Sequence, residues 1–182
     1  MHVFRGLPSP LQRRPSAVAI GNFDGVHLGH QALLEYVKEA AQARGLVPSV
    51  VTFEPHPKDF FGRGGEVARI STLYDKVNAI LETGIERIYI LPFNARLAGM
   101  PAETFVRDVL LEGLGACWIS VGRDFRFGGD RAGNVDLLEQ LSRTLPYELY
   151  VSPTFYHKDA RVSSSRIREA LAQGDLYEAA LM

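Results

Sequence analysis

The sequence of 182 residues is short of cysteine, of long apolar runs and of net charge. Its one cysteine, Cys117, excludes an internal disulfide, and its apolar neighbours predict that it is buried as a small hydrophobic side chain. The lack of disulfides favours a reducing compartment, so we expect the protein in the cytoplasm. The net charge of -1 gives no bulk reason to expect nucleic acid or an anionic membrane as a partner.

Signals for a membrane and for two common phosphate motifs are missing too. No apolar run approaches the ~20 residues of a membrane span, and residues 1–16 lack the apolar core of a secretory signal. No lysine is followed by Ser or Thr, which excludes a Walker A loop. Gly21, Gly25 and Gly29 are spaced four apart, which does not fit the dinucleotide-binding fingerprint.

What is present is a glycine-rich turn between a strand and a helix. Residues 17–20 are apolar and predict a buried strand, and an amphipathic helix is expected over Leu28–Arg44. This arrangement points backbone N–H groups and a helix N-terminus at a phosphate. The turn therefore predicts a nucleotide-handling enzyme.

Two histidines, His27 and His30, begin that helix three residues apart and can share one face. Gly29 between them leaves room for a ligand to approach the backbone. As imidazolium groups, aided by the helix dipole, they would stabilise charge on a phosphate in transit. One alternative is a zinc site with His56 as third ligand, although no Cys or Glu-rich motif accompanies it. The other is that the histidines only decorate a helix start.

Strand and helix patterns alternate along the rest of the chain. We expect strands at 17–21, 48–53, 87–91, 116–121 and 147–151, with Val3 and Phe4 in an edge strand, and a mobile loop at 58–66. Helices are expected at Leu28–Arg44, from Ser71 or Thr72 to 83, from 101 to 113, and at 135–144, 164–173 and 175–181. The pattern predicts an α/β fold, a Rossmann-like parallel sheet of about five strands with helices on both faces.

The loops that follow the strands should meet at one sheet edge, where ligands bind in such folds. In the loop 122–133, Phe125 and Phe127 could wall a flat ligand or form a small loop core, and Asp124 could orient a nucleophile or help hold a metal. Residues 162–168 could bind an anion through serine hydroxyls and two arginines, Arg166 and Arg168. The alternative is that a serine only caps the following helix and the arginines are solvated. The prolines of residues 54–57 would hold His56 in one fixed position at the site. The alternative is a simple proline turn that leaves His56 exposed to solvent.

Together these stretches resemble the prokaryotic bifunctional flavokinase/FAD synthetase family, specifically its adenylyltransferase module. Residues 21–30 look like the first family signature, 53–57 the second and 122–128 the third. Residues 162–168 are similar to the Ile-Ser-Ser-Thr-x-x-Arg motif of the wider nucleotidylyltransferase superfamily, with Ser165 where threonine is usual. The resemblance implies that FMN is adenylylated by ATP, its phosphate attacking the α-phosphorus in line while pyrophosphate leaves.

The resemblance also assigns roles to residues. The ATP site would be lined by Gly21, Asn22, Phe23, Asp24, Gly25, His27, Gly29, His30, Ser163, Ser164, Ser165 and Arg168. Of these, His27, His30 and Arg168 would stabilise charge, and Asp124 is a further catalytic candidate. His56, Pro57 and Phe127 would border the flavin, and Mg²⁺, with ligands unknown, would accompany the phosphates.

The chain stops at Met182, where the family continues into a riboflavin kinase domain. The resemblance therefore implies that residues 1–182 form an FMN adenylyltransferase domain and that the C-terminal riboflavin kinase domain is absent from this chain. In a full-length protein, the two domains could contact each other. Phosphorylation of riboflavin is not expected. Two alternatives stay open: a nucleotidylyltransferase for phosphopantetheine, nicotinamide mononucleotide or a choline- or glycerol-type phosphate, and a flavin- or nucleotide-binding protein without turnover.

Overall fold

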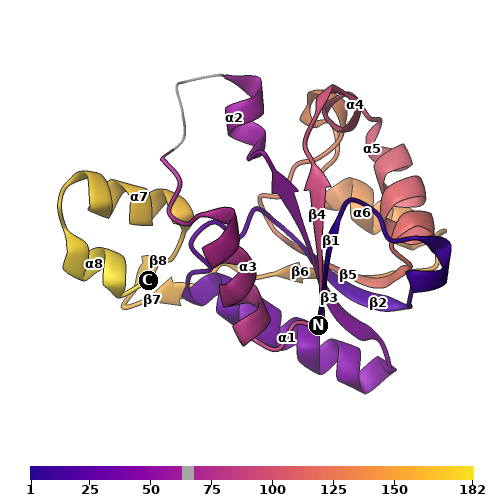
Figure 1. Ribbon diagram of the computed structural model, residues 1–182, viewed down its shortest axis with the longest axis horizontal. Helices are drawn as coiled ribbons and strands as arrows, with labels where there is room; N and C mark the ends of the chain where they lie inside the picture. Colours follow the sequence, from indigo (N-terminus) through magenta and orange to yellow (C-terminus); the bar gives the residue numbers. More distant parts are fainter. Residues whose placement is uncertain (63–67) are drawn as a thin grey trace.

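The computed structural model describes residues 1–62 and 68–182, which fold around a six-stranded sheet (Figure 1). Its strands are β1 (His2–Arg5), β2 (Ser16–Ile20), β3 (Val47–Glu54), β4 (Arg87–Pro92), β5 (Ala116–Gly122) and β6 (Glu148–Ser152), in the order β1-β4-β3-β2-β5-β6. Every neighbouring pair is parallel. The predicted parallel sheet is confirmed, with the edge strand at Val3 and Phe4 bringing five strands to six.

Helices cover both faces of this sheet because its central strand is apolar on both. All five residues of β2 are buried. Val18 and Ile20 enter one core with α5 (Ala102–Thr104), the π-helical segment η2 (Phe105–Gly113) that continues it, and α6 (Val135–Ser142). Ala17 and Ala19 enter the other core with α1 (Leu28–Arg44) and α3 (Leu73–Glu82). Alternate side chains of one strand thus hold two helical layers.

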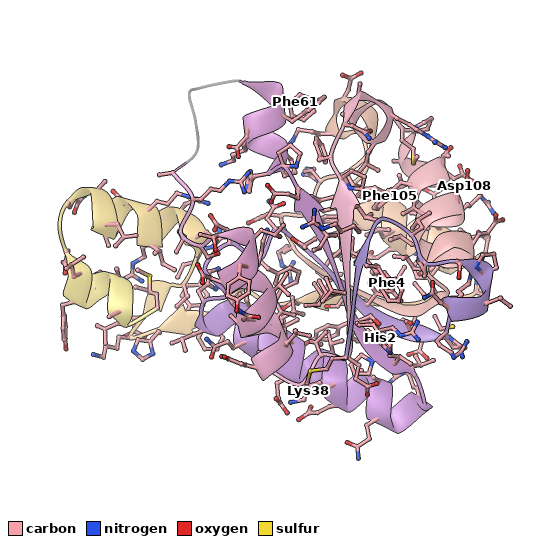
Figure 2. All side chains as sticks on the ribbon, in the orientation of Figure 1. His2, Phe4, Lys38, Phe61, Phe105 and Asp108 are labelled. Atoms are coloured by element: carbon pink, nitrogen blue, oxygen red, sulfur yellow. The ribbon has the colours of Figure 1, made fainter. Side chains whose placement is uncertain are left out.

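The remaining elements are short and surround the ends of the strands. They are the 3-10 turns η1 (Pro10–Gln12) and η3 (Gly129–Arg131), the helices α2 (Pro57–Phe61), α4 (Ala95–Ala98), α7 (Ser164–Ala172) and α8 (Leu176–Ala180), and the hairpin β7 (Tyr156–His157) with β8 (Ala160–Arg161). Phe61 of α2 and Lys38 of α1 lie at opposite ends of the molecule (Figure 2). Among the residues that the structure describes, no helix has the length and apolar character needed to span a bilayer.

Two sequence predictions fail locally. The segment 58–66 begins as helix, not as loop, because Pro57 takes the first helical position of α2 behind the capping side chain of His56; residues 63–67 lie outside the described part. Cys117 is exposed, not buried. Ser16 pairs with Ala116 and Ala17 with Trp118, so Cys117 is the extra residue of a β-bulge and turns outward.

The strand order sets where a ligand can enter. From β2 the chain passes through α1 to β3 on one side, while β5 pairs with β2 on the other side. Connections that diverge in this way leave a crevice beyond the carboxyl ends of the two strands. The glycine-rich turn after β2 and the loop after β5 both open into it.

Candidate active site

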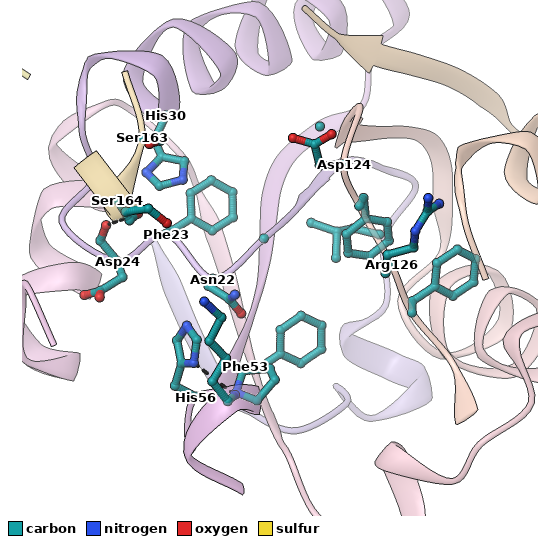
Figure 3. A pocket seen from close by; sticks show the side chains of 18 of the residues that line it. Asn22, Phe23, Asp24, His30, Phe53, His56, Asp124, Arg126, Ser163 and Ser164 are labelled. Carbon is teal, nitrogen blue, oxygen red and sulfur yellow. Dashed lines mark hydrogen bonds between the residues drawn. The ribbon is translucent and has the colours of Figure 1, made fainter. Parts of the chain in front are cut away.

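A pocket of about 510 Å³ occupies this crevice, a volume typical of small-molecule sites. Residues from the segments 21–30 and 163–168 form one side, which we call the inner wall; residues from the segment 122–133, with Arg161, form the other, the outer wall. Figure 3 shows Asp24, His30 and Ser164 on one side and Asp124 with Arg126 on the other. The predicted site residues that line the pocket are Gly21, Asn22, Phe23, Asp24, His27, Gly29, His30, His56, Pro57, Asp124, Phe127, Ser163, Ser164, Ser165 and Arg168.

Gly25 is the predicted site residue that does not line the pocket. Its φ is +84°, and a Cβ there would stand 2.8 Å from Cγ2 of Ile70. Its N–H donates to Ser71 Oγ at 3.1 Å. Gly25 therefore shapes the turn from behind and is not expected to contact a nucleotide directly.

The turn presents a run of unused backbone donors. Among the described residues, the N–H groups of Asn22, Phe23 and Asp24 donate to no acceptor, whereas the N–H of Gly21 is bound to the Val51 carbonyl at 3.1 Å. Phe23 has a left-handed φ of 50°. Consecutive free N–H groups in such a turn form an anion-binding concavity. This supports the phosphate-binding prediction. Gly29 also lines the pocket, and a Cβ there would stand 3.1 Å from Phe155 Cβ, so a side chain at this position would be crowded.

The two histidines lie face to face at the start of α1. Their ring centroids are 3.7 Å apart with planes at 12°, and His27 Nδ1 accepts the His30 N–H at 3.2 Å. Burial lowers the pKa of His27 to about 4. Burial, and then the nearby His27 and Lys76, lower the pKa of His30 well below its ordinary value.

Both histidines are therefore neutral near pH 7 in the free protein, and the imidazolium charge expected beside a phosphate in transit stays a prediction. Since the Nδ1 atom of His27 is an acceptor, its proton is assigned to Nε2. His30 Nδ1 is buried and has no partner among the described residues. The pair therefore offers neutral hydrogen-bonding groups to a ligand.

Asp24 joins the parts of the inner wall. Its carboxylate accepts the N–H groups of Ile70 at 3.2 Å and Ser71 at 3.1 Å and pairs with the Arg168 guanidinium. Its backbone carbonyl accepts Ser164 Oγ at 2.9 Å. Burial raises the pKa of Asp24, but the hydrogen bonds from Ile70 and Ser71 and the Arg168 charge outweigh it and leave the pKa lowered. The prediction that α7 faces the glycine-rich turn is confirmed.

The two arginines of α7 point in different directions. Arg168 lines the pocket, paired with Asp24, while its Nε donates to the Ala68 carbonyl at 2.7 Å. Arg166 pairs with Glu178 of α8 and donates to the Arg161 carbonyl at 3.1 Å. The expectation that Arg166 adds charge to this site is therefore wrong. Ser163 caps α7 by accepting the N–H of Arg166 at 3.3 Å.

The outer wall is held more loosely. The side chain of Asp124 is 73% exposed and pairs with Arg161 at 2.7 Å. Phe127 is only 8% exposed and stacks beneath Phe125 with ring centroids 5.3 Å apart. Phe127 thus belongs to a small loop core, as the second alternative proposed, and the half-buried Phe125 packs against it.

His56 is not exposed as a simple proline turn would leave it. It is 8% exposed, its Nδ1 accepts the Lys58 N–H at 3.1 Å, and burial lowers its pKa.

Sequence reasoning also missed three arginines of the outer wall that line the pocket, Arg123, Arg126 and Arg131. Their signal was present, because they stand in the same glycine-rich loop as Phe125.

No metal-binding cluster of three His, Cys, Asp or Glu side chains occurs in the described ranges. The donor set therefore does not fit a resident metal held by protein ligands alone, either at Asp124 or as a zinc site at the histidines.

Residues 9–166 match the model of the FAD synthetase family. The bifunctional riboflavin kinase/FMN adenylyltransferase of Escherichia coli (strain K12) is 35% identical over 179 residues, covering 97% of this chain and 57% of that protein. Its Pseudomonas fluorescens counterpart is 39% identical over 176 residues, covering 96% and 56%. The chain thus spans little more than half the length of these relatives. A crystal structure described as a macrolide-efflux protein from Streptococcus pneumoniae matches with a TM-score of 0.80 at 26% identity, covering 97% of this chain and 59% of that one.

Proposed function

This chain belongs to the FAD synthetase family, and we propose that its pocket transfers the AMP moiety of ATP to FMN, giving FAD and pyrophosphate. The observation that carries the proposal is the pairing of two unlike walls across one pocket. The inner wall offers free backbone N–H groups, two neutral histidines and serine hydroxyls. The outer wall offers an aromatic ring and several arginines.

In the proposed reaction an FMN phosphate oxygen forms a bond to the α-phosphorus of ATP. The bond from that phosphorus to the bridging oxygen breaks in line, and the electron pair leaves with pyrophosphate. Holding the two reactants in line can contribute up to ~7–11 kcal/mol. A general base is not required, because the FMN phosphate is already anionic near pH 7.

The inner wall is the proposed place of the ATP phosphates. The N–H groups of residues 22–24 and Nε2 of His27 would donate to phosphate oxygens, with the hydroxyls of Ser163 and Ser165 at the start of α7. Ser164, whose hydroxyl donates to the Asp24 carbonyl, would join α7 to the turn in this ATP site. Each donor aimed at charge that develops in the transition state is worth ~3–4 kcal/mol. His30 and Arg168 complete this wall, the first through its unpartnered ring nitrogen and the second as the partner of Asp24.

The flavin is assigned to the outer wall and the mouth of the pocket. Phe125 offers a ring face, with Phe127 packed behind it, and His56 and Pro57 border the opening. Asp124 is kept as a catalytic candidate in this proposal, although it is exposed and paired with Arg161. Mg²⁺ is proposed to enter with ATP and to be held chiefly by phosphate oxygens, as is usual for this cation.

Two further proposals concern the setting of the chain. Because the relatives named above are bifunctional and extend well beyond the matched part, we propose that this unit contacts a riboflavin kinase domain in a full-length protein. The cytoplasm is the proposed location, since the one cysteine leaves no internal disulfide that would need an oxidising compartment.

The test is chromatography of the purified chain incubated with FMN, ATP and Mg²⁺, with riboflavin plus ATP in parallel. FAD from FMN, and no FMN from riboflavin, is expected. The same assay with nicotinamide mononucleotide or phosphopantetheine separates the other nucleotidylyltransferases, which would use those acceptors and not FMN. Binding of FMN or ATP by calorimetry without any product would identify a binding protein and overturn the proposed activity.

A further inference from the structure

A buried lysine lies next to the inner wall and has no role in the reaction as proposed. Lys76 projects from α3 into the protein, four residues before the buried Ile80, and is only 5% exposed. Its Nζ donates to the Asn22 carbonyl at 3.2 Å and approaches Thr52 Oγ1 at 3.4 Å. Thr52 Oγ1 in turn donates to the same carbonyl at 3.1 Å. Lys76 therefore supports the glycine-rich turn from behind, outside the set of residues that lines the pocket.

The ammonium of Lys76 is buried and forms no ion pair with the residues that the structure describes. No carboxylate in the described part of the chain lies within 4.0 Å of it. The acids whose charge acts on it, Asp24 and Glu54, are paired instead with Arg168 and Arg69. Burial lowers the pKa of Lys76. A buried charge without an ionic partner lowers the stability of the folded chain. We therefore expect a functional gain that offsets the cost of Lys76.

That gain can come from the orientation of one peptide group. In a trans peptide the C=O and N–H point in opposite directions. The two bonds from Lys76 and Thr52 draw the Asn22 carbonyl back into the protein. They thereby turn the N–H of Phe23, the next residue, away from Lys76, and this N–H is one of the free donors of the turn.

We propose that Lys76 is a positioning residue of adenylyl transfer, an inference that rests on the proposed function. By holding the Asn22 carbonyl from behind, Lys76 aims the N–H group of Phe23 at the ATP phosphates. Its positive charge adds to the attraction of the inner wall for a polyanion, although Lys76 never touches the substrate.

The main test compares Lys76→Met with the wild type in FAD synthesis. Methionine keeps the length of the side chain and removes the charge and the donor. We expect kcat to fall on the order of 10- to 100-fold while KM for FMN changes little. The melting temperature should stay equal or rise, because a buried charge without an ionic partner is removed. Lys38→Met, which alters a lysine paired with Glu35 on the outer side of α1, is the matched control and should leave kcat unchanged.

A pH profile separates this role from simple packing. His30 stacks on His27, and after burial the charges of His27 and of Lys76 on α3 lower the pKa of His30. Without the Lys76 charge, His30 should take up its proton at higher pH, so the acidic limb of kcat/KM should move to higher pH. If Lys76 only filled space in the core, Lys76→Met would change the rate without moving the acidic limb of kcat/KM.

Thr52→Val provides a second variant that leaves all charges in place. It removes one of the two donors to the Asn22 carbonyl, so a smaller fall in kcat with an unmoved acidic limb is expected. Wild-type kcat in Lys76→Met would overturn the inference. If Lys76→Met does not fold, wild-type kcat in Thr52→Val would overturn it instead. A wild-type chain that makes no FAD would overturn the proposed function, and with it this inference.

Discussion

The two walls of the pocket are built in different ways. On the inner wall, Asp24 is 5% exposed and receives bonds from α7 and from the segment before α3. On the outer wall, Asp124 has one ion-pair partner within the described part of the chain, Arg161, and both side chains are more than half exposed. A buried wall held together by several hydrogen bonds is preorganised, which is what transition-state stabilisation needs. An exposed ion pair is weak and adaptable, which suits a binding surface. We therefore expect inner-wall changes to lower kcat and outer-wall changes to raise KM.

The largest effect should follow from removing the stacked histidines. His27→Ala and His30→Ala should each lower kcat for FAD synthesis on the order of 10²–10³-fold, because each removes a preorganised polar group. Because the two rings stack with centroids 3.7 Å apart, the double variant should lose less than the product of the two single losses. His2→Ala, on the distant strand β1, is the control and should behave as wild type. Wild-type turnover in either variant would contradict the catalytic assignment of that histidine.

The next effect concerns the stability of the inner wall. Asp24→Asn leaves Arg168 without its anion and weakens the bonds from Ile70 and Ser71, so the free energy of unfolding should fall by roughly 3 kcal/mol. Urea unfolding followed by circular dichroism measures it. Asp124→Asn on the outer wall is the comparison and should cost at most about 1 kcal/mol. Equal losses in the two variants would remove the distinction between the walls.

Much of this architecture was predictable because its signals are local. The apolar run 17–20, the capping glycine at Gly45 and the amphipathic pattern between them fixed α1 at Leu28–Arg44, as observed. The convergence of the strand-end loops followed from parallel topology alone. The sequence pattern therefore located the pocket, and every predicted site residue except Gly25 lines it.

What could not be predicted depends on contacts between distant segments. The pKa values of His27 and His30 are lowered by burial in the folded chain, which a local pattern does not reveal. Arg166 turned away because Glu178, on another helix, offered an ion pair. Lys76 had a local signal, since it precedes Ile80 by four residues on one helix face, but its two acceptors come from other strand ends. Cys117 was misplaced because a bulge changes strand alternation.

The third prediction concerns acid sensitivity, which should originate on the inner wall. The pKa of His27 is lowered from 6.5 to about 4, so the unfolded chain binds a proton at this site before the folded chain does. The stabilising contribution of neutral His27 is therefore complete above pH 6.5 and declines as the pH falls to about 4. Asp24, with its lowered pKa, adds a loss that begins below the ordinary pKa of a carboxyl group.

Urea unfolding at a series of pH values tests this assignment. Between pH 6.5 and about 4, the wild type should lose more unfolding free energy than His27→Ala. Parallel curves for the two proteins would assign the acid sensitivity to other groups.

The smallest effect is expected at the outer wall, and it decides the role of Asp124. Its exposure and its single partner, Arg161, predict that Asp124→Asn raises KM for FMN a few-fold, on the scale of a surface ion pair, and leaves kcat within about twofold. Arg161→Gln should give a similar KM, and the double variant should add little, because one interaction is removed in all three. Asp108→Asn, an exposed acid of η2 away from the pocket, is the control. A fall of kcat beyond tenfold in Asp124→Asn alone would make Asp124 a catalytic residue and would show that the outer wall becomes ordered when substrates bind.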